Sequence, residues 1–254
     1  VFTNIDSGIA SGNVTLVQKG QIINANRIEY KKDKSQDGLS YRAIGNVIIK
    51  DSSRVATCGL ARYDRENERT ILELEPEIKE NNRLLAGTKI KLGYEQERLK
   101  NLHIPKNAYA ITPIRGHQAS SIDSNQVGDS LRFNDKMEGT SLSGFFENGA
   151  LDSLRIEGMA KTLYHIFEDS IYQGKNNASG DTIAISFYDN DLNTINIIGG
   201  SEGKYIPDTL SDGNEHTVTY KANRIKYHFL KDESDFNGNV NIKHDGTSLD
   251  AGFV

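Results

Sequence analysis

The sequence predicts an all-β protein, specifically an elongated antiparallel stacked β-jelly roll made of successive hairpin repeats. Three observations support this prediction. Apolar and polar residues alternate with a period of two along most of the chain, helical periodicity is almost absent, and turns rich in Asn, Asp and Gly separate the apolar runs. The apolar fraction is 36% and the mean hydropathy is −0.56, which suits a thin core shared among many strands.

Strand-like segments follow one another along the whole chain. They share a β-branched or aliphatic residue at every second position, as expected for a strand with one buried face. The clearest of them are 14–16, 47–49, 71–74, 90–92, 183–185 and 195–197.

Three ungapped copies of one pattern predict hairpins. After each of the aromatic residues Tyr94, Phe146 and Phe187, a Leu stands five residues on, a Leu or Ile eight residues on, and an Ile ten residues on. A strand that ends on an aromatic residue, a short charged turn and a return strand account for this spacing. Six aromatic residues mark about six such units: Tyr30, Tyr63, Tyr94, Phe146, Phe187 and Tyr227.

Two shorter signatures recur near the two ends of the chain. The hexapeptide at 25–30 matches the one at 222–227 in five of six positions, and Gly-Asn-Val begins at Gly12, Gly45 and Gly238. Repeats that cannot bury their own apolar face must stack on their neighbours. We therefore expect one β-repeat body over 1–254, divisible into sub-modules 1–104 and 131–254, with a polar loop at 105–130.

Composition and motifs argue against several classes of function. The net charge of −5 disfavours nucleic-acid binding, and no run approaches the ~20 apolar residues of a membrane span. Cys58 is the single cysteine, and we interpret it as a small strand residue. Residues 189–193 begin like a calcium loop but lack its later glycine and glutamate, so a turn is the better interpretation.

No catalytic or metal-binding constellation is recognisable, so the sequence predicts no enzyme activity and no cofactor. The carboxylates concentrate in turns, where they are usually solvated. The histidines show no metal-type spacing with one another. They are His103, His117, His165, His216, His228 and His244.

Several segments resemble the OstA-like domain, which occurs in LptA-type periplasmic lipopolysaccharide carriers and in the N-terminal region of LptD-type outer-membrane proteins. The segments that carry the resemblance are 25–30, 45–49 (GNVII), 56–63 (ATCGLARY), 72–74, 84–87 and 238–251. Residues 160–177 and 203–207 are similar to longer members of that family.

The resemblance implies a V-shaped β-taco whose apolar inner face holds the lipid A acyl chains of lipopolysaccharide. It implies a location in the periplasm, with possible attachment to the outer membrane. It also implies assembly through terminal edge strands, with copies of itself, with other OstA-like transport proteins or with an LptD-type partner in the outer membrane.

Alternation around the hairpin turns identifies fifteen candidate groove residues. The same residues would equally form an ordinary closed core. They are Ile28, Tyr30, Leu92, Tyr94, Leu102, Ile104, Phe146, Leu154, Ile156, Ile185, Phe187, Ile195, Ile197, Ile225 and Tyr227.

Three functions therefore remain open. A lipid carrier predicts a continuous apolar groove, whereas a structural or adhesive surface protein predicts a sealed core with capped ends. A β-solenoid acting on polysaccharide predicts acidic residues that face one solvent cleft.

Overall fold

The computed structural model describes residues 6–18, 20–32, 39–80, 83–117, 130–148, 150–169, 171–189, 191–208, 216–229, 231 and 233–254. These residues form strands and turns but no helix, so the all-β prediction is confirmed. They group into two compact units. Unit 1 comprises Val1–Tyr109 and Ser141–Asp152, and unit 2 comprises Ala110–Thr140 and Ser153–Val254.

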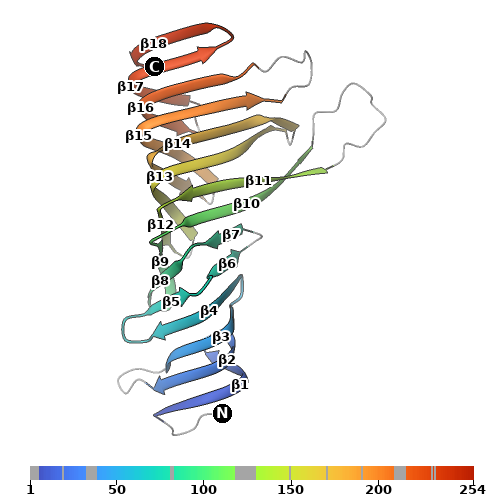
Figure 1. Cartoon of the computed structure of the whole chain (residues 1–254), viewed down its shortest axis with the longest axis vertical. Helices are drawn as coiled ribbons and strands as arrows, with labels where there is room; N and C mark the ends of the chain where they lie inside the picture. Colours follow the sequence, from blue (N-terminus) through green and yellow to red (C-terminus); the bar gives the residue numbers. More distant parts are fainter. Residues whose placement is uncertain are drawn as a thin grey trace. The chain divides into compact units, whose positions relative to one another are not determined.

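Unit 1 is built from short and medium strands that follow the chain order in Figure 1. They are β1 (Ser7–Gln18), β2 (Gln21–Lys32), β3 (Leu39–Lys50), β4 (Arg54–Asp64), β5 (Arg69–Glu73), β6 (Glu77–Glu80), β7 (Arg83–Ala86), β8 (Lys89–Glu95), β9 (Arg98–Ile104) and β12 (Ser141–Glu147).

Unit 2 contains the longest strands of the protein. They are β10 (Ala108–His117), β11 (Ser130–Gly139), β13 (Ala150–Glu168), β14 (Ile171–Tyr188), β15 (Asp191–Pro207), β16 (Val218–His228), β17 (Glu233–His244) and β18 (Thr247–Phe253). The first residues of β10 and β13 belong to unit 1. Strand β10 lies within the segment 105–130 that was expected to be a polar loop, and residues 118–129 lie outside the described residues.

The predicted antiparallel hairpins are confirmed in both units. Strands β8 and β9 pair through Glu95 and Arg98, and the two residues between them, Gln96 and Glu97, both have positive φ. Two residues also separate β14 from β15, where Tyr188 pairs with Asp191. Such two-residue turns match the right-handed twist of the strands that they join.

Alternate long strands carry a β-bulge near the middle, and successive bulges flank the same residue of the strand that lies between them. In unit 1 they occur at Gly12-Asn13 and Gly45-Asn46, and both residues of each pair have positive φ. In unit 2 they occur at 158–159, 199–200 and 238–239. The recurring Gly-Asn-Val signature is therefore a bulge, in which Gly and Asn adopt the left-handed conformation that they tolerate best.

Opposite each bulge stands a single residue of the neighbouring strand. Asn26, Asp181 and Asn223 occupy this place, and their side chains lie against Gly45, Gly199 and Gly238, respectively. This position explains the repeated Ala-Asn-Arg-Ile sequence, because the Asn marks the bend and its neighbours Ala and Ile face the core.

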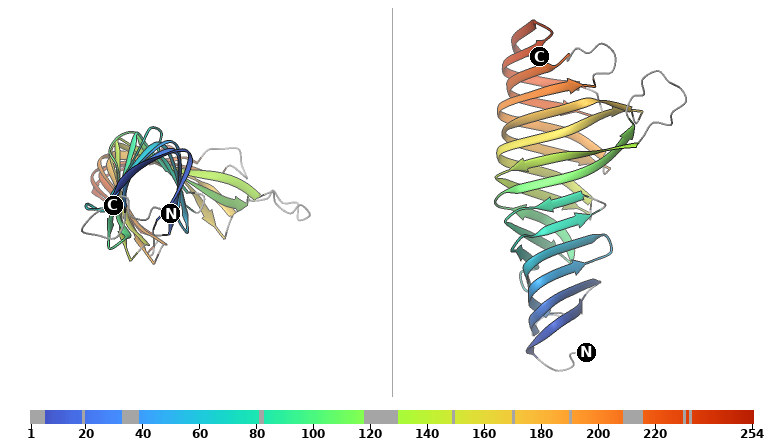
Figure 2. Two further views of the ribbon diagram at one scale, coloured as in Figure 1. Left: turned by 90° about the horizontal axis from the view of Figure 1, so that it is seen from below. Right: turned by 45° about the vertical axis from the view of Figure 1, so that its right-hand side comes forward.

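The aligned bulges form a crease along which each unit folds. Bulges bend strands and increase their twist, and Figure 2 shows this curvature along the blue strands of unit 1 and the orange strands of unit 2. In unit 2 we call the part that contains 153–157, 182–188, 191–198 and 224–228 the first leaf. The part that contains 160–168, 171–180, 201–207 and 218–222 is the second leaf.

Candidate functional site

The first leaf of unit 2 presents a ladder of isoleucines to the interior. Ile156 pairs with Ile183, Ile183 with Ile197, and Ile197 with Ile225, so one residue from each of four adjacent strands lies in the same row. All four side chains are fully buried next to the crease. A second row, two residues nearer the hairpin turns, contains Leu154, Ile185, Ile195 and Tyr227.

Glycines allow this ladder to pack tightly against backbone. A Cβ atom on Gly139 would come within 2.5 Å of Ile156 Cγ2, and one on Gly180 within 2.7 Å of Ile197 Cγ2. The same arrangement occurs in unit 1 between Gly87 and Ile104. The interior is therefore closed at the crease.

Exposure of the interior rises away from the crease. Along β14, Ile183 and Ile185 are buried, whereas Phe187, near the hairpin turn, is half-buried. The next residue, Tyr188, faces the other side of the sheet and is 69% exposed. Along β14, the apolar interior is thus more exposed near the hairpin turn of the first leaf than at the crease.

In unit 1 the interior row next to the turns is aromatic. Tyr30 pairs with Tyr41 and Tyr41 with Tyr63, and the rings of Tyr41 and Tyr63 are 5.5 Å apart. Further along, the guanidinium of Arg54 lies 5.9 Å from the ring of Phe146, within cation–π distance.

The structure places all fifteen candidate groove residues toward the interior of their unit, and none is exposed. Nine are buried: Ile28, Tyr30, Leu102, Ile104, Ile156, Ile185, Ile195, Ile197 and Ile225. Six are half-buried: Leu92, Tyr94, Phe146, Leu154, Phe187 and Tyr227. Contact with lipid remains a prediction for all fifteen.

The second leaf of unit 2 carries polar interior residues that the sequence analysis missed. Asn176 is buried, its Nδ2 donates to the Tyr164 hydroxyl at 2.8 Å, and its Oδ1 accepts from the Tyr220 hydroxyl at 2.6 Å. The Tyr227 hydroxyl, which comes from the first leaf, donates to the Tyr220 hydroxyl at 2.8 Å. This tyrosine network joins the two leaves across the interior.

Burial keeps the tyrosine network neutral. Removal from water raises the pKa of Tyr164, Tyr220 and Tyr227 above the usual value for a phenol, because it disfavours the phenolate. The neutral hydroxyls are therefore hydrogen-bond donors and acceptors. No spacing in the sequence signals this set, since its members come from three strands.

A hollow of about 480 Å³ on unit 2 is lined by other residues than the candidate groove. Its lining includes exposed charged side chains such as Lys161, Glu202 and Lys221, together with Thr162 and Ala178. Lys221 Nζ and Glu202 Oε2 form an ion pair at 3.1 Å. Most of the lining area is nevertheless apolar, and the lining contains none of the fifteen candidate groove residues.

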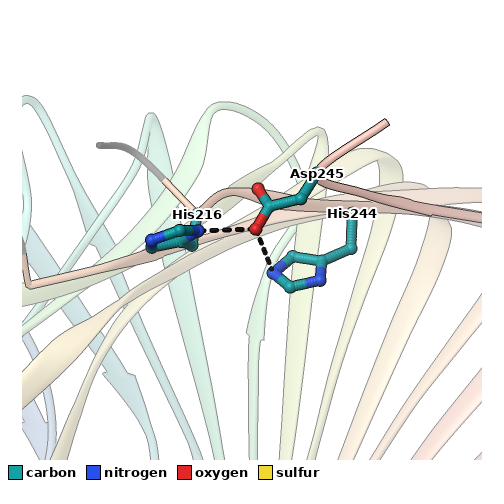
Figure 3. Close-up of side chains that lie close together, drawn as sticks. All are labelled: His216, His244 and Asp245. Carbon is teal, nitrogen blue, oxygen red and sulfur yellow. Dashed lines mark hydrogen bonds and ion pairs between the residues drawn. The ribbon is translucent and has the colours of Figure 1, made fainter. Parts of the chain in front are cut away.

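The structure also describes Cys58 and two of the histidines, for which the sequence predicted no reactive or metal-binding role. Cys58 is buried in β4, and burial raises the pKa of its thiol to about 11, so it stays protonated as expected for a packed strand residue. The histidines His216 and His244, by contrast, meet at the carboxylate of Asp245, as Figure 3 shows. Their separation of 28 positions gave no signal in the sequence.

Among the described residues, no helix has the length and apolar character needed to cross a membrane.

Comparison with solved structures finds LptH, described as the LptA homologous periplasmic component of the conserved lipopolysaccharide transport device from Pseudomonas aeruginosa. The two chains are 10% identical, the match covers 75% of this chain and 93% of LptH, and the TM-score is 0.32. No curated protein matches the chain.

Comparison with family models identifies the N-terminal part of the chain. Residues 3–98, which lie within unit 1, match the model described as LptA/(LptD N-terminal domain) LPS transport protein. The match includes the first two Gly-Asn bulges and the tyrosine row from Tyr30 to Tyr63. The match confirms the resemblance to the OstA-like family over residues 3–98, which are similar to the LptA/LptD N-terminal domain.

Proposed function

We propose that this chain is a non-enzymatic carrier or bridge for lipopolysaccharide in the periplasm, which shields acyl chains from water inside its folded sheets. The observation that carries the proposal is the match of residues 3–98 to a family of lipopolysaccharide transport proteins. The apolar interior rows of both units support it.

The physical basis is the hydrophobic effect. Each CH₂ group of an acyl chain that leaves water contributes ~0.8 kcal/mol. Rows of similar apolar side chains, such as Ile156, Ile183, Ile197 and Ile225, provide near-equivalent positions along the stack of strands. Near-equivalent positions give a flat free-energy profile, along which a lipid moves without covalent chemistry.

We place the entry of the acyl chains at the hairpin turns of the first leaf, because the interior is closed at the crease. Phe187, Leu154 and Tyr227 are half-buried there, whereas Ile156 and Ile197 are fully buried. Lipid would separate the leaves from this side and replace side-chain contacts between them.

A pair of adjacent residues on β14 gives a matched test. Phe187 faces the interior and Tyr188 faces solvent, so Phe187→Glu introduces a charge at the proposed entry and Tyr188→Glu introduces the same charge outside. We expect lipopolysaccharide to co-purify with wild type and Tyr188→Glu from a host that produces it, and to be lost from Phe187→Glu. Native mass spectrometry measures the bound lipid.

Both variants must first show the wild-type circular dichroism spectrum. Equal lipid loading of folded Phe187→Glu and Tyr188→Glu would contradict the proposed entry. A charge at fully buried Ile156 or Ile197 is unsuitable for this test, because an unpaired buried charge would unfold the protein.

A structural β-repeat protein with a closed core is the second candidate function. The observation that favours it is that nine of the fifteen candidate groove residues are buried in the described structure. If wild-type protein carries no lipid in the same experiment, this second function is preferred.

We further propose that partners join at the outermost strands by strand addition, as the family resemblance implies. Within the described residues, β1 forms its long ladder of backbone hydrogen bonds with β2, and β18 forms its ladder with β17. The expected partners are copies of this chain, other OstA-like transport proteins, and an LptD-type protein of the outer membrane.

A further inference from the structure

We infer that His216, His244 and Asp245 form a binding site for a divalent transition-metal ion of the Zn²⁺ class. The Nδ1 atom of His216 lies 2.5 Å from Asp245 Oδ2, and the Nε2 atom of His244 lies 3.5 Å from the same oxygen. One ligand atom of each residue lies within 4.8 Å of the other two. Figure 3 shows both imidazoles directed at the one carboxylate.

The backbone places these side chains together. Val218, the first residue of β16, pairs with His244, the last residue of β17, so His216 lies just beyond the end of the ladder. His244 pairs with Thr247, and the two residues between them, Asp245 and Gly246, have φ of 46° and 77°. This tight turn brings the Asp245 carboxylate back over the strand ends.

The donor set selects the class of metal. Two imidazole nitrogens and one carboxylate oxygen suit Zn²⁺ and related transition metals, whereas Ca²⁺ and Mg²⁺ prefer oxygen ligands alone. With metal–ligand distances of about 2.1 Å, tetrahedral ligands lie ~3.4 Å apart. The His244–Asp245 separation already matches this value, and the His216–Asp245 separation must lengthen.

The side chains have room for that adjustment. His216, His244 and Asp245 are 46%, 51% and 45% exposed, respectively, so small rotations meet little steric resistance. Exposure also leaves a fourth coordination position for water, as in zinc sites with three protein ligands.

Two other histidine–carboxylate pairs in unit 2 have no third ligand among the described residues. His228 Nε2 lies 3.0 Å from Asp235 Oδ2, and His165 Nδ1 lies 2.8 Å from Asp135 Oδ1. In the part of the chain that the structure describes, His216, His244 and Asp245 are the one group of three or more His, Cys, Asp or Glu residues whose ligand atoms all lie within 4.8 Å of one another. The His228–Asp235 pair therefore serves as a matched control.

A bound ion would tie the segment before β16 to the turn between β17 and β18. Strand β18 is otherwise held by its ladder with β17, and most of its side chains are exposed. Because an ion that binds only the folded protein stabilises it, metal would fix this last strand.

The test is a titration of the full chain, without an affinity tag and after treatment with a chelator. We expect wild type to bind one Zn²⁺ by calorimetry, and Co²⁺ to give the visible absorption of a tetrahedral site. The variants His216→Ala and His244→Ala should each bind Zn²⁺ at least about tenfold more weakly. His228→Ala should bind as wild type does.

Asp245→Asn provides a second variant that keeps the hydrogen-bond acceptor but removes the charge, and it should also weaken binding. Absence of saturable Zn²⁺ binding in wild type would overturn the inference. So would equal affinity of wild type, His244→Ala and Asp245→Asn.

Discussion

At the scale of single residues, the crease depends on positions with a left-handed backbone. Asn13, Asn46 and Asn239 follow a glycine in three bulges, and Asn is among the few residues with a side chain that adopts this conformation readily. In β13 the equivalent position is Met159, with φ of 52° and an exposure of 79%. Met159 gains little from packing and carries the backbone strain.

We therefore expect Met159→Asn to raise the free energy of unfolding by ~1 kcal/mol, because Asn lowers the cost of the left-handed conformation. The reverse substitution in unit 1, Asn46→Met, should lower the free energy of unfolding by a similar amount. Urea unfolding followed by circular dichroism measures both. A destabilised Met159→Asn variant would show that the methionine side chain makes a stabilising contact.

At the scale of an element, strand β16 shows how one bend creates a long-range contact. Tyr220 and Tyr227 lie on either side of the crease at Asn223, and both face the interior. Folding along the crease brings their hydroxyl groups within 2.8 Å of each other. The same strand therefore contributes to both walls of the interior and to the bonds between them.

Tyr220→Phe should lower the free energy of unfolding by about 1–3 kcal/mol. The substitution removes the Tyr220 hydroxyl, which donates a hydrogen bond to Asn176 Oδ1 and accepts one from the Tyr227 hydroxyl. Both partners would then be unsatisfied, and unsatisfied buried polar groups lower stability. The matched control is Tyr188→Phe, which removes the hydroxyl of an exposed tyrosine and should change stability little. Equal stability of the two variants would argue that the network does not hold the leaves together.

At the scale of the whole molecule, an outermost strand with exposed apolar side chains invites pairing with another chain. In β18, Leu249 and Phe253 are 47% and 63% exposed. These side chains are suited to contact with an added strand, in agreement with the proposed assembly at β1 and β18.

The double variant Leu249→Lys/Phe253→Lys should reduce assembly, because lysine on an outermost strand discourages pairing. Light scattering over a range of concentrations should show assemblies for wild type and monomers for the variant. Tyr188→Lys, which adds a lysine on the surface of β14, should assemble as wild type does. Assemblies of unchanged mass in the double variant would exclude β18 as the contact.

The sequence by itself determined the properties that depend on near neighbours along the chain. Alternation with period two predicted the strands and the inward direction of all fifteen candidate groove residues, because successive side chains of a strand point to opposite faces. Turn residues predicted the hairpins. The Gly-Asn-Val repeat was visible too, although its meaning as a bulge required the strand register.

Only the tertiary structure decided what depends on how separate strands meet. The tyrosine network joins residues from three strands, and the His216–His244–Asp245 group joins a segment before β16 to a turn beyond β17. The extent to which the interior is closed likewise follows from the bend of several strands at once. These features arise because bulges fold each sheet along a shared crease, and no local pattern records which side chains will then face one another.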